Sequence, residues 1–578
     1  MGTFLIPDEN NSFKELLSDD IFIDKTDFIA EIAGRIDRPN KLVAFTKPRR
    51  FGKTVTADML SSFFSRGANA GSLFENRTIA GLFGEEKAKN ENGQEITVKY
   101  RYTDRHLNKH HVICIDMNAV NGLFYRYLQN APQKNGVTDL VDFLEYSVIS
   151  EFKSIPEFRK ILESNEIENT GLFKALIELN NAPELRARFI FIMDEWDLIY
   201  REYRDNETLQ IKFIDMLKGL FKTGDGLACF SLAYLTGILP IKKYNSQSAL
   251  NTFYEFNMLT PGNFAPWFGF TEEDVAGICR LPVCAFTQNV LREWYEGYKI
   301  QIFDRKTGGY KEVDVYNPNS VCRAVSRSEC TGYWGDSSSD EEFIRLVNMN
   351  LDGIKDDILR MIAGDSVKFN FKSFKNDMVS IKNKNQVFSL MVCLGYLGCS
   401  GKDGTERLAY VPNKEIRESL SELVRDQPWF NSMPVIQRSE KLFQAIRSLD
   451  AAKTAEIIGD IHNSPYISVI GYNKEEALVF CLISGLMWCA GSSYDSYREL
   501  PAGKGFADLV FVPKSGSDLP ILITEFKRDY SAEDALNQIK KQDYAARYRK
   551  NGDDREVLLI GLNYSSETKE HQCVIEKM

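Results

Sequence analysis

The fold of this chain is decided near its N-terminus by the stretch Lys47-Pro48-Arg49-Arg50-Phe51-Gly52-Lys53-Thr54, which follows the apolar run Leu42-Val43-Ala44-Phe45. The ending Gly-Lys-Thr suits a phosphate-binding loop. Glycine lets backbone N–H groups turn inward, lysine reaches the β- and γ-phosphates, and the threonine hydroxyl binds Mg²⁺. Apolar residues then recur at helical spacing, and a helix N-terminus favours anions. We therefore predict a strand, a nucleotide-binding loop from Pro48 to Thr54, and a helix.

One position departs from the strict phosphate-loop consensus, which has glycine where Lys47 stands. Pro48 and the two arginines that follow it must then shape the loop in place of that glycine. Taken alone, the stretch is equally well explained as a strand–turn–helix unit that binds no nucleotide.

A second apolar run, Phe189-Ile190-Phe191-Ile192-Met193, ends in Asp194-Glu195. Unbroken apolar runs are typical of buried parallel strands. We predict that Asp194 holds the Mg²⁺ shell and that Glu195 orients or deprotonates the attacking water. The alternative is that two acids only cap a buried strand. Their occurrence together with Gly52-Lys53-Thr54 in one domain-sized span favours nucleotide binding.

Two further runs, at residues 112–116 and 232–237, are predicted to be strands, with helix-length segments between them. This alternation predicts a parallel α/β sheet. Thr236 stands at the end of its strand and is a candidate sensor of the γ-phosphate or of the attacking water. An ordinary strand-end threonine is an equally open interpretation.

A different pattern occurs near the other end of the chain. Residues 505–512 are predicted to form a strand that carries Asp508, and residues 521–527 its hairpin partner with Glu525-x-Lys527. The two-residue period of a strand places Glu525 and Lys527 on one face. With Asp508 they supply two carboxylates for a divalent cation and a lysine for the hydrolytic water. This is the arrangement of a PD-(D/E)XK phosphodiesterase core, although an isolated E-x-K is usually a solvated strand face.

The segments around this pattern favour the same core. Glu475 and Glu476 open an apolar helical segment, from which Glu476 is a candidate to join the metal cluster. Residues 535–544 have the pattern of an amphipathic helix, and residues 557–562 that of a closing strand. The order helix, acid-bearing strand, E-x-K strand, helix and strand is typical of the nuclease fold.

With both ends interpreted, the chain resembles the bacterial AAA-ATPase-like proteins that join a phosphate-loop domain to a C-terminal PD-(D/E)XK nuclease domain. The resemblance spans nearly the whole chain. Its signatures before the nuclease domain are Asp24-Lys25-Thr26, Pro48 to Thr54, Asp194-Glu195, Trp294-Tyr295-Glu296-Gly297-Tyr298, Tyr316-Asn317-Pro318, Gly395-Tyr396-Leu397 and Pro412-Asn413. Those in the nuclease domain are Glu476, Gly503, Gly505, Asp508, Glu525-x-Lys527 and Gln538-Ile539. The resemblance implies an ATPase that uses ATP and Mg²⁺, and a nuclease that uses Mg²⁺ or Mn²⁺, with Gln538 supporting the metal-binding residues.

Two positions depart from the pattern of this family. Phe506 stands where relatives tend to carry arginine, and Phe480 where many have histidine. Neither phenylalanine can supply the polar contact found there. The set Asp508, Glu525 and Lys527 is intact, and the family's own loop also lacks the first glycine, so Lys47 agrees with it.

Composition limits the possible interpretations. A chain of 578 residues with 43% hydrophobic content should hold several packed domains. No apolar run approaches the length needed to span a bilayer, and no secretory signal is visible, so we expect a cytoplasmic protein without a membrane partner. Eleven cysteines form no C-x-x-C pair and fit reduced core thiols. A net charge of −10 argues against a surface coated for nucleic acid, but it permits a local basic site.

We expect three parts: a phosphate-loop ATPase domain over residues 1–262, a helical middle region over 263–455, and a restriction-endonuclease-like α/β domain over 456–578. The middle region resembles a winged-helix element, because residues 386–396 and 415–424 fit helices and 396–411 fits a hairpin. Whether that element contacts DNA or relays the nucleotide state is open at this stage.

From these parts we expect an ATP-dependent, metal-dependent nuclease that acts on DNA, in which the N-terminal domain gates or drives the C-terminal one. The alternative is a nucleotide-switched regulatory or defence protein whose nuclease-like domain binds nucleic acid or a partner without cleavage. The intact Asp508, Glu525 and Lys527 favour the first, whereas Phe506 leaves the second open. A homo-oligomer is compatible with both.

Overall fold

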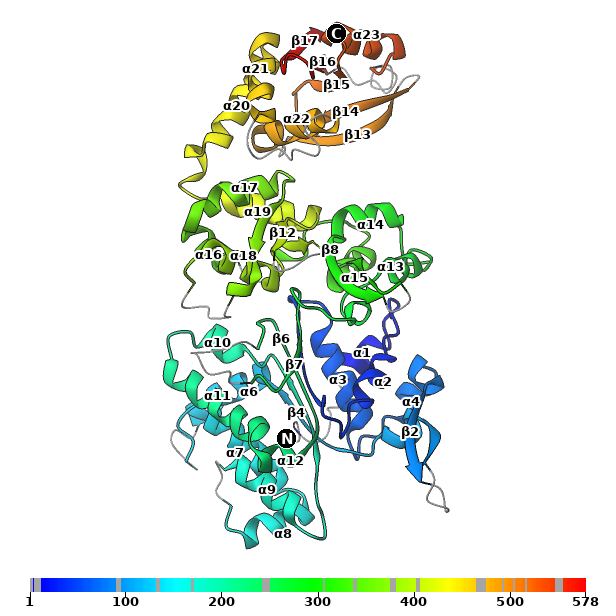
Figure 1. Ribbon diagram of the computed structural model, residues 1–578, viewed down its shortest axis with the longest axis vertical. Coiled ribbons are helices and arrows are strands. Elements are labelled where there is room, and N and C mark those ends of the chain that lie inside the picture. The colour runs from blue at the N-terminus through cyan, green and yellow to red at the C-terminus, as the bar shows by residue number, and fades with distance from the viewer. Residues whose placement is uncertain are drawn as a thin grey trace. The chain divides into compact units, whose positions relative to one another are not determined.

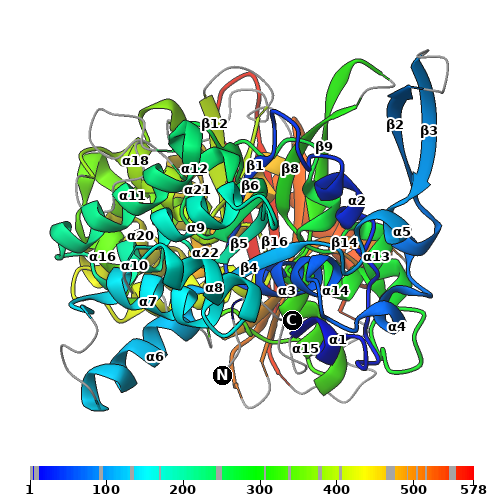
Figure 2. The ribbon, with the colours of Figure 1, turned by 90° about the horizontal axis from the view of Figure 1, so that it is seen from below.

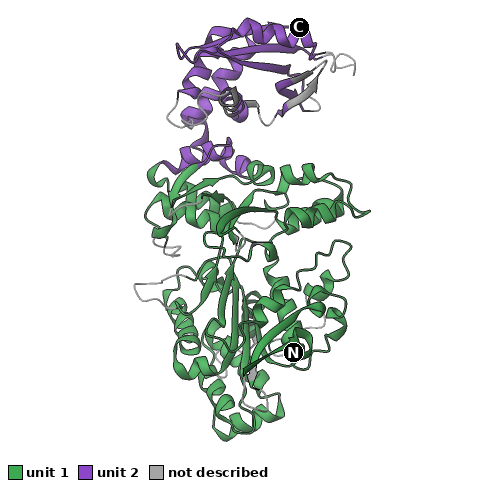
Figure 3. Cartoon of the chain, turned by 45° about the vertical axis from the view of Figure 1, so that its right-hand side comes forward, with its two compact units in different colours: residues 1–352, 367–419 green, residues 353–366, 420–578 purple. Residues whose placement is uncertain are grey.

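The computed structural model describes residues 4, 12–89, 95–130, 136–167, 171–241, 250–304, 307–335, 340–374, 381–401, 406–463, 475–490, 493–502, 505–514, 517–545 and 555–578. The chain divides into two compact units (Figure 3). The first comprises Met1–Asp352 and Val367–Ser419, and the second comprises Gly353–Ser366 and Leu420–Met578. The domain limits that the sequence suggests at residues 262 and 455 stay predictions.

The first unit is built around a five-stranded parallel sheet in the order β4-β5-β6-β1-β7. Its strands are β1 (Leu42–Thr46), β4 (His111–Asp116), β5 (Phe189–Asp194), β6 (Phe230–Gly237) and β7 (Tyr254–Phe256). Strands β1, β5 and β6 are buried along their whole length, as their unbroken apolar runs predict. The predicted parallel α/β sheet is confirmed.

Helices cover both faces of this sheet (Figure 1). Alternate residues of each strand point to opposite faces, so each strand contributes side chains to a core on either side. Val43 and Phe45 face a core that includes α2 (Phe28–Ala33) and α3 (Lys53–Phe64). Leu42 and Ala44 face a core formed with helices from the other side. Those helices are α6 (Met117–Asn130), α7 (Leu140–Phe152), α8 (Pro156–Ser164), α9 (Leu172–Asn181), α10 (Leu198–Glu202) and α11 (Glu207–Lys222).

Shorter elements complete this part of the unit. They are α1 (Ser12–Leu16), α4 (Gly71–Phe74), α5 (Tyr102–His106) and α12 (Gly224–Ala228). An antiparallel hairpin of β2 (Phe83–Lys89) and β3 (Glu95–Arg101) projects from the rest of the unit, as Figure 2 shows. This hairpin was not predicted from the sequence.

The segments that follow β7 pack into the same unit. Helices α13 (Glu272–Ile278), α14 (Gln288–Tyr295) and α15 (Pro318–Arg327) share one core, and β8 (Tyr298–Asp304) pairs with β9 (Gly309–Val315). Helix α16 (Asp340–Asn348) comes next. Helix α18 (Lys384–Leu394) lies beside an antiparallel sheet of β10 (Val367–Asn370), β12 (Glu406–Tyr410) and β11 (Gly398–Ser400). The predicted order of helix, hairpin and helix is therefore present, and it ends in α19 (Lys414–Arg425).

The second unit contains a mixed five-stranded sheet in the order β13-β14-β15-β16-β17. Its strands are β13 (Tyr494–Ala502), β14 (Gly505–Pro513), β15 (Ile521–Arg528), β16 (Val557–Tyr564) and β17 (His571–Lys577). Only β15 and β16 pair in parallel. One face packs against α20 (Pro434–Arg447), α21 (Ala451–His462) and α22 (Glu475–Ala490), and the other against α23 (Ala532–Gln542). Helix α17 (Ile354–Ile362) also belongs to this unit.

This arrangement confirms the predicted multidomain α/β layout, with a parallel sheet near the N-terminus and a mixed sheet near the C-terminus. Among the described residues, no helix combines the length and the apolar character that a membrane crossing requires.

Candidate functional site

The stretch from Lys47 to Gly52 forms the loop that joins β1 to α3. Gly52 caps the helix in a left-handed conformation with a φ of 80°, which glycine adopts without steric cost. Arg50 also has a positive φ, 68°, which is uncommon for a residue with a side chain. The loop therefore opens onto the N-terminus of a twelve-residue helix, where backbone N–H groups and the helix dipole favour an anion.

The two residues after Gly52 contact the acids at the end of β5. Lys53 is 4% exposed, and its Nζ donates to the carbonyl oxygen of Pro48 at 2.9 Å. The same Nζ lies 3.9 Å from Glu195 Oε1. Thr54 Oγ1 donates to Asp194 Oδ2 at 2.6 Å. Four of the residues predicted to bind nucleotide and metal thus lie together, although they are about 140 positions apart in the chain.

Asp194 is buried, and its environment disfavours the charged carboxylate. Burial, and next the charge of Glu195, raise the pKa of Asp194 to about 7, while the hydrogen bond from Thr54 and the charge of Lys53 oppose this. A divalent cation beside Asp194 would replace the proton. A carboxylate and a hydroxyl oxygen are ligands that suit Mg²⁺, so these residues fit the predicted metal.

Glu195 is held by a residue that the sequence analysis missed. Its carboxylate accepts a hydrogen bond from Arg201 of α10. Arg201 Nε also donates to Asp197 Oδ2 at 3.1 Å, and Asp197 in turn accepts from the backbone N–H of Leu239 at 2.9 Å. The only sequence signal for this network is the spacing of Asp197 and Arg201, which puts them one helical turn apart.

Thr236 lies on β6, the strand between β1 and β5. It is fully buried, and its carbonyl oxygen accepts from Trp196 N at 3.0 Å. Its strand therefore connects the loop to Asp194 and Glu195. The sensor role of its hydroxyl stays a prediction.

A cavity of about 820 Å³ opens beside the loop. Arg49 to Thr56, Glu195 and Arg201 line its polar part. Its remaining wall includes apolar side chains and two arginines from segments that the sequence analysis did not assign to a site, among them Phe22, Trp267, Phe270, Arg323 and Arg327. This size and this mixture of linings are typical of pockets for small organic ligands.

The C-terminal acids also lie close together. Leu509 of β14 pairs with Thr524 of β15, which places Asp508 next to Glu525 across the strands. Asp508 Oδ2 accepts from the backbone N–H of Phe526 at 2.8 Å. Lys527 Nζ donates to Glu525 Oε1 at 3.1 Å.

Glu525 is 1% exposed, and its Oε1 also accepts a hydrogen bond from Gln538 Nε2 of α23. Its Oε2 has no hydrogen-bond partner among the described residues. Burial, and next the charge of Asp508, raise the pKa of Glu525 to about 7. An unsatisfied buried carboxylate oxygen beside a second carboxylate fits a divalent cation better than it fits an apolar core.

The structure describes the other predicted residues of this site only in part. The backbone of Glu476 lies in α22, but the side chains of Glu476, Phe480 and Phe506 are outside the described part of the structure. Within the described residues, no group of three or more histidine, cysteine, aspartate or glutamate side chains is arranged to hold a metal ion. The part of Glu476 in the metal cluster stays a prediction.

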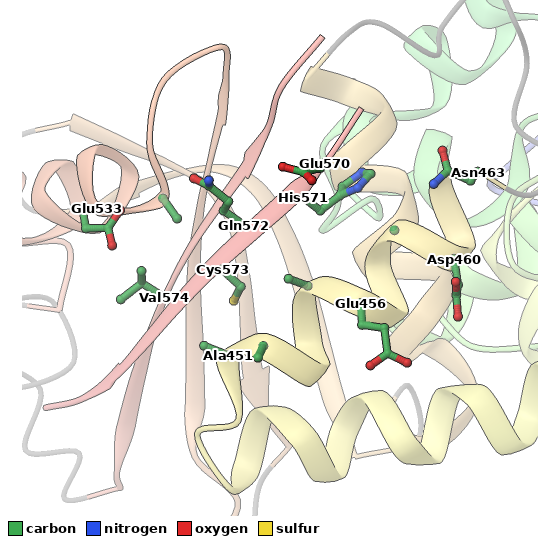
Figure 4. A pocket seen from close by; sticks show the side chains of 14 residues that line it. Ala451, Glu456, Asp460, Asn463, Glu533, Glu570, His571, Gln572, Cys573 and Val574 are labelled. Atoms are coloured by element: carbon green, nitrogen blue, oxygen red, sulfur yellow. The ribbon is translucent and has the colours of Figure 1, made fainter. Parts of the chain in front are cut away.

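The second unit has another cavity, also of about 820 Å³, which Asp508, Glu525 and Lys527 do not line. Figure 4 shows its walls, formed by α21, β17 and the start of α23. Four carboxylates border it, from Glu456, Asp460, Glu533 and Glu570. Their negative charge disfavours nucleic acid phosphate at this position.

Comparison with known protein families gives one match in each part of the chain that carries a candidate site. Residues 10–245 match a family described as predicted AAA-ATPases, and residues 476–573 match the PD-(D/E)XK nuclease superfamily. No curated protein matches the chain. The first match contains the loop, Asp194 and Glu195, and the second contains Asp508, Glu525, Lys527 and Gln538. The chain therefore contains a predicted AAA-ATPase-like domain at residues 10–245 and a domain of the PD-(D/E)XK nuclease superfamily at residues 476–573.

Proposed function

We propose that this protein hydrolyses ATP in its first unit and uses it to control a metal-dependent DNA nuclease in its second. The observation that carries the proposal is the 2.6 Å hydrogen bond between Thr54 and Asp194, which joins the loop to the acid-bearing strand end. A phosphate loop that is hydrogen-bonded to Asp194, and that lines one cavity together with Glu195, supplies the parts that nucleotide hydrolysis requires.

In the ATPase site, residues Pro48 to Thr54 would bind the phosphates through their backbone N–H groups. Lys53 would exchange the carbonyl oxygen of Pro48 for phosphate oxygens, and Glu195 would accept a proton from the attacking water. Thr54 and Asp194 would hold Mg²⁺, which when bound neutralises charge on the phosphates. Glu195 must first exchange the hydrogen bond of Arg201 for one from water.

In the nuclease site, Asp508 and Glu525 would hold Mg²⁺ or Mn²⁺, with Glu476 a further candidate ligand. That ion, when bound, would polarise the scissile phosphate. Lys527 would orient the hydrolytic water, and Gln538 would keep the carboxylate of Glu525 in place. A cytoplasmic location and assembly into a homo-oligomer stay expectations from the sequence.

The nuclease-superfamily domain would bind nucleic acid near Lys540 and Lys541 of α23. Lys540 Nζ is within 2.6 Å of Glu576 Oε2, so its charge is partly compensated in this structure. The other members of that basic cluster, Arg547, Arg549 and Lys550, are outside the described residues.

The ATPase site is tested by two substitutions. Lys53→Ala removes the cation that neutralises the phosphates and should abolish ATP binding in a calorimetric titration. Glu195→Gln keeps the size of the side chain but removes the base, so it should bind ATP and hydrolyse it about 10²- to 10⁴-fold more slowly. Lys109→Ala, at an exposed lysine, is the matched control. Full ATP affinity in Lys53→Ala would show that the loop assignment is wrong.

The two metal sites predict a pH dependence. Asp194 and Glu525 each have a pKa raised to about 7, so between their ordinary pKa of about 4 and pH 7 both hold protons that the unfolded chain has lost. Their contribution to stability therefore falls as the pH rises from the ordinary carboxyl range through 7. Because Mn²⁺ competes with these protons, it should raise the melting temperature more at pH 8 than at pH 5.5.

Calorimetric titration with Mn²⁺ should also release protons into the buffer at pH 7, and less at pH 8.5. Glu525→Gln removes one of the two titrating carboxyls and should reduce the release. An equal Mn²⁺ affinity at pH 5.5 and pH 8 would contradict this assignment of the ligands.

The nuclease site is tested by Asp508→Ala and Lys527→Ala. Both should eliminate metal-dependent cleavage of DNA while ATP turnover remains measurable, because the two sites have separate cores. Asp508→Ala should also lose Mn²⁺, whereas Lys527→Ala should keep it. Asp518→Ala and Lys514→Ala, at exposed positions near the same strands, are matched controls. If Asp508→Ala cleaves as well as the wild type, the nuclease mechanism fails and the non-cleaving switch takes its place.

A further inference from the structure

The nucleotide-binding loop is in contact with segments far from it in the sequence. Gly395, at the end of α18, has a φ of 91° and lies so close to the loop that a Cβ there would be 2.7 Å from Pro48 Cβ. The ring of Phe51 packs edge-on against Tyr298 at 5.2 Å between centroids. Tyr298 Oη donates to the carbonyl oxygen of Gly395 at 2.8 Å, so the two contacts support each other.

Arg50 makes the most directional of these contacts. Its Nη1 donates to Asn319 Oδ1 at 2.9 Å and to the carbonyl oxygen of Tyr333 at 2.7 Å. Its backbone has the unfavourable positive φ of 68°. Such a conformation persists only where surrounding contacts hold it. Asn319 and Tyr333 provide that hold, and they lie 269 and 283 positions away from Arg50.

The peptide of Tyr333 connects Arg50 to a buried carboxylate. On one side its carbonyl oxygen accepts from Arg50. On the other, its N–H donates to Glu415 Oε1 at 2.8 Å. Glu415 is fully buried, and the same Oε1 accepts from Trp334 N at 2.8 Å and from Ser320 Oγ at 2.9 Å. Burial raises the pKa of Glu415 to about 7, while the hydrogen bonds from Ser320, Tyr333 and Trp334, and after them the charge of Arg50, oppose the rise.

Glu415 stands in the first turn of α19, which extends from Lys414 to Arg425. The chain passes from the first compact unit to the second at Leu420, within this helix. The hydrogen-bonded series Arg50, Tyr333 and Glu415 therefore ends on the element through which the chain continues to the nuclease-superfamily domain.

We propose that Arg50 and Glu415 are positioning residues that fix the nucleotide-binding loop from outside and transmit its occupancy through Tyr333 to α19. This inference rests on the proposed binding of ATP. In the structure Lys53 Nζ is bound to the carbonyl oxygen of Pro48. Phosphate binding would remove that bond, and a shift of Pro48 would then be transmitted to Gly395, which lies so close that it has no room for a Cβ atom. The winged-helix-like element then relays the nucleotide state.

The coupling must be reciprocal, because a residue whose position depends on the nucleotide also changes nucleotide affinity. Glu415→Ala removes the acceptor of three hydrogen bonds and should weaken the binding of AMP-PNP with Mg²⁺ by about tenfold. Glu415→Gln retains an acceptor oxygen and should restore binding to within about twofold. Asp142→Asn is the matched control, since Asp142 is a buried carboxylate that accepts from Thr138 and Lys212 outside this network.

A second measurement is the change in hydrogen exchange that AMP-PNP causes. A purely structural role for Glu415 would not alter this change. Hydrogen exchange of the full chain should show that AMP-PNP changes protection in residues 329–335 and 410–420 of the wild type. Glu415→Ala should lose that change while it still binds AMP-PNP at saturating concentration. Should Glu415→Ala fail to fold, Asn319→Ala removes a single hydrogen bond from Arg50 and decides the question by the same two measurements.

The outcomes separate the inference from the proposed function. A wild type that does not bind AMP-PNP overturns the proposed ATP binding itself. If the wild type binds AMP-PNP, but Glu415→Ala binds it with unchanged affinity and shows the same change in protection in residues 410–420, the coupling alone is overturned. Loss of affinity in Glu415→Gln as large as in Glu415→Ala also overturns the role of its acceptor oxygen.

Discussion

The hydrogen bond between Thr54 and Asp194 joins the two parts of the candidate site in the first unit. It connects the start of α3 with the end of β5, and it lies where the strands of a parallel sheet end. At such an edge the chain must place polar groups, because the loops leave the buried core there. The same edge carries the N-terminus of α3, which favours anions. The order β5-β6-β1 in the sheet therefore brings together the residues that we propose bind phosphate.

Both candidate sites share one structural feature. Each places a carboxyl group in a nearly buried position beside a second acid, and in each the pKa of the buried group rises to about 7. Such groups are costly in a folded protein unless something compensates their charge. Thr54 and Lys53 compensate Asp194 in part, and Lys527 and Gln538 do so for Glu525. A divalent cation would complete the compensation, which is why these residues fit metal binding better than a structural role.

The fold was predictable from the sequence because its central strands are unbroken apolar runs. Residues 189–193 and 232–237 contain too few polar positions to form surface strands, and the structure buries them entirely. The main site residues were predictable for the same reason, since Asp194 and Glu525 interrupt or end such runs. The roles of all these residues stay predictions.

Contacts between distant segments were not predictable. The contacts of Asn319, Tyr333 and Glu415 around the loop carry no periodic signal in a single sequence. The contact of Arg201 with Glu195 is signalled only by the helical spacing of Arg201 and Asp197. Which residues come into contact at these positions depends on tertiary packing, which local sequence patterns do not encode. Two of them stand beside segments that the resemblance marks as signatures without a role: Asn319 follows Tyr316-Asn317-Pro318, and Glu415 lies just after Pro412-Asn413.

We propose that the nucleotide state of the first unit controls hydrolysis by the second. Cleavage of plasmid and of single-stranded DNA by the wild type should be measured with Mg²⁺ or Mn²⁺, in the presence and in the absence of ATP. We expect cleavage that requires the metal and rises when ATP is present. Equal cleavage with and without ATP would contradict the coupling, and the absence of cleavage of DNA and RNA under every nucleotide condition would contradict the nuclease.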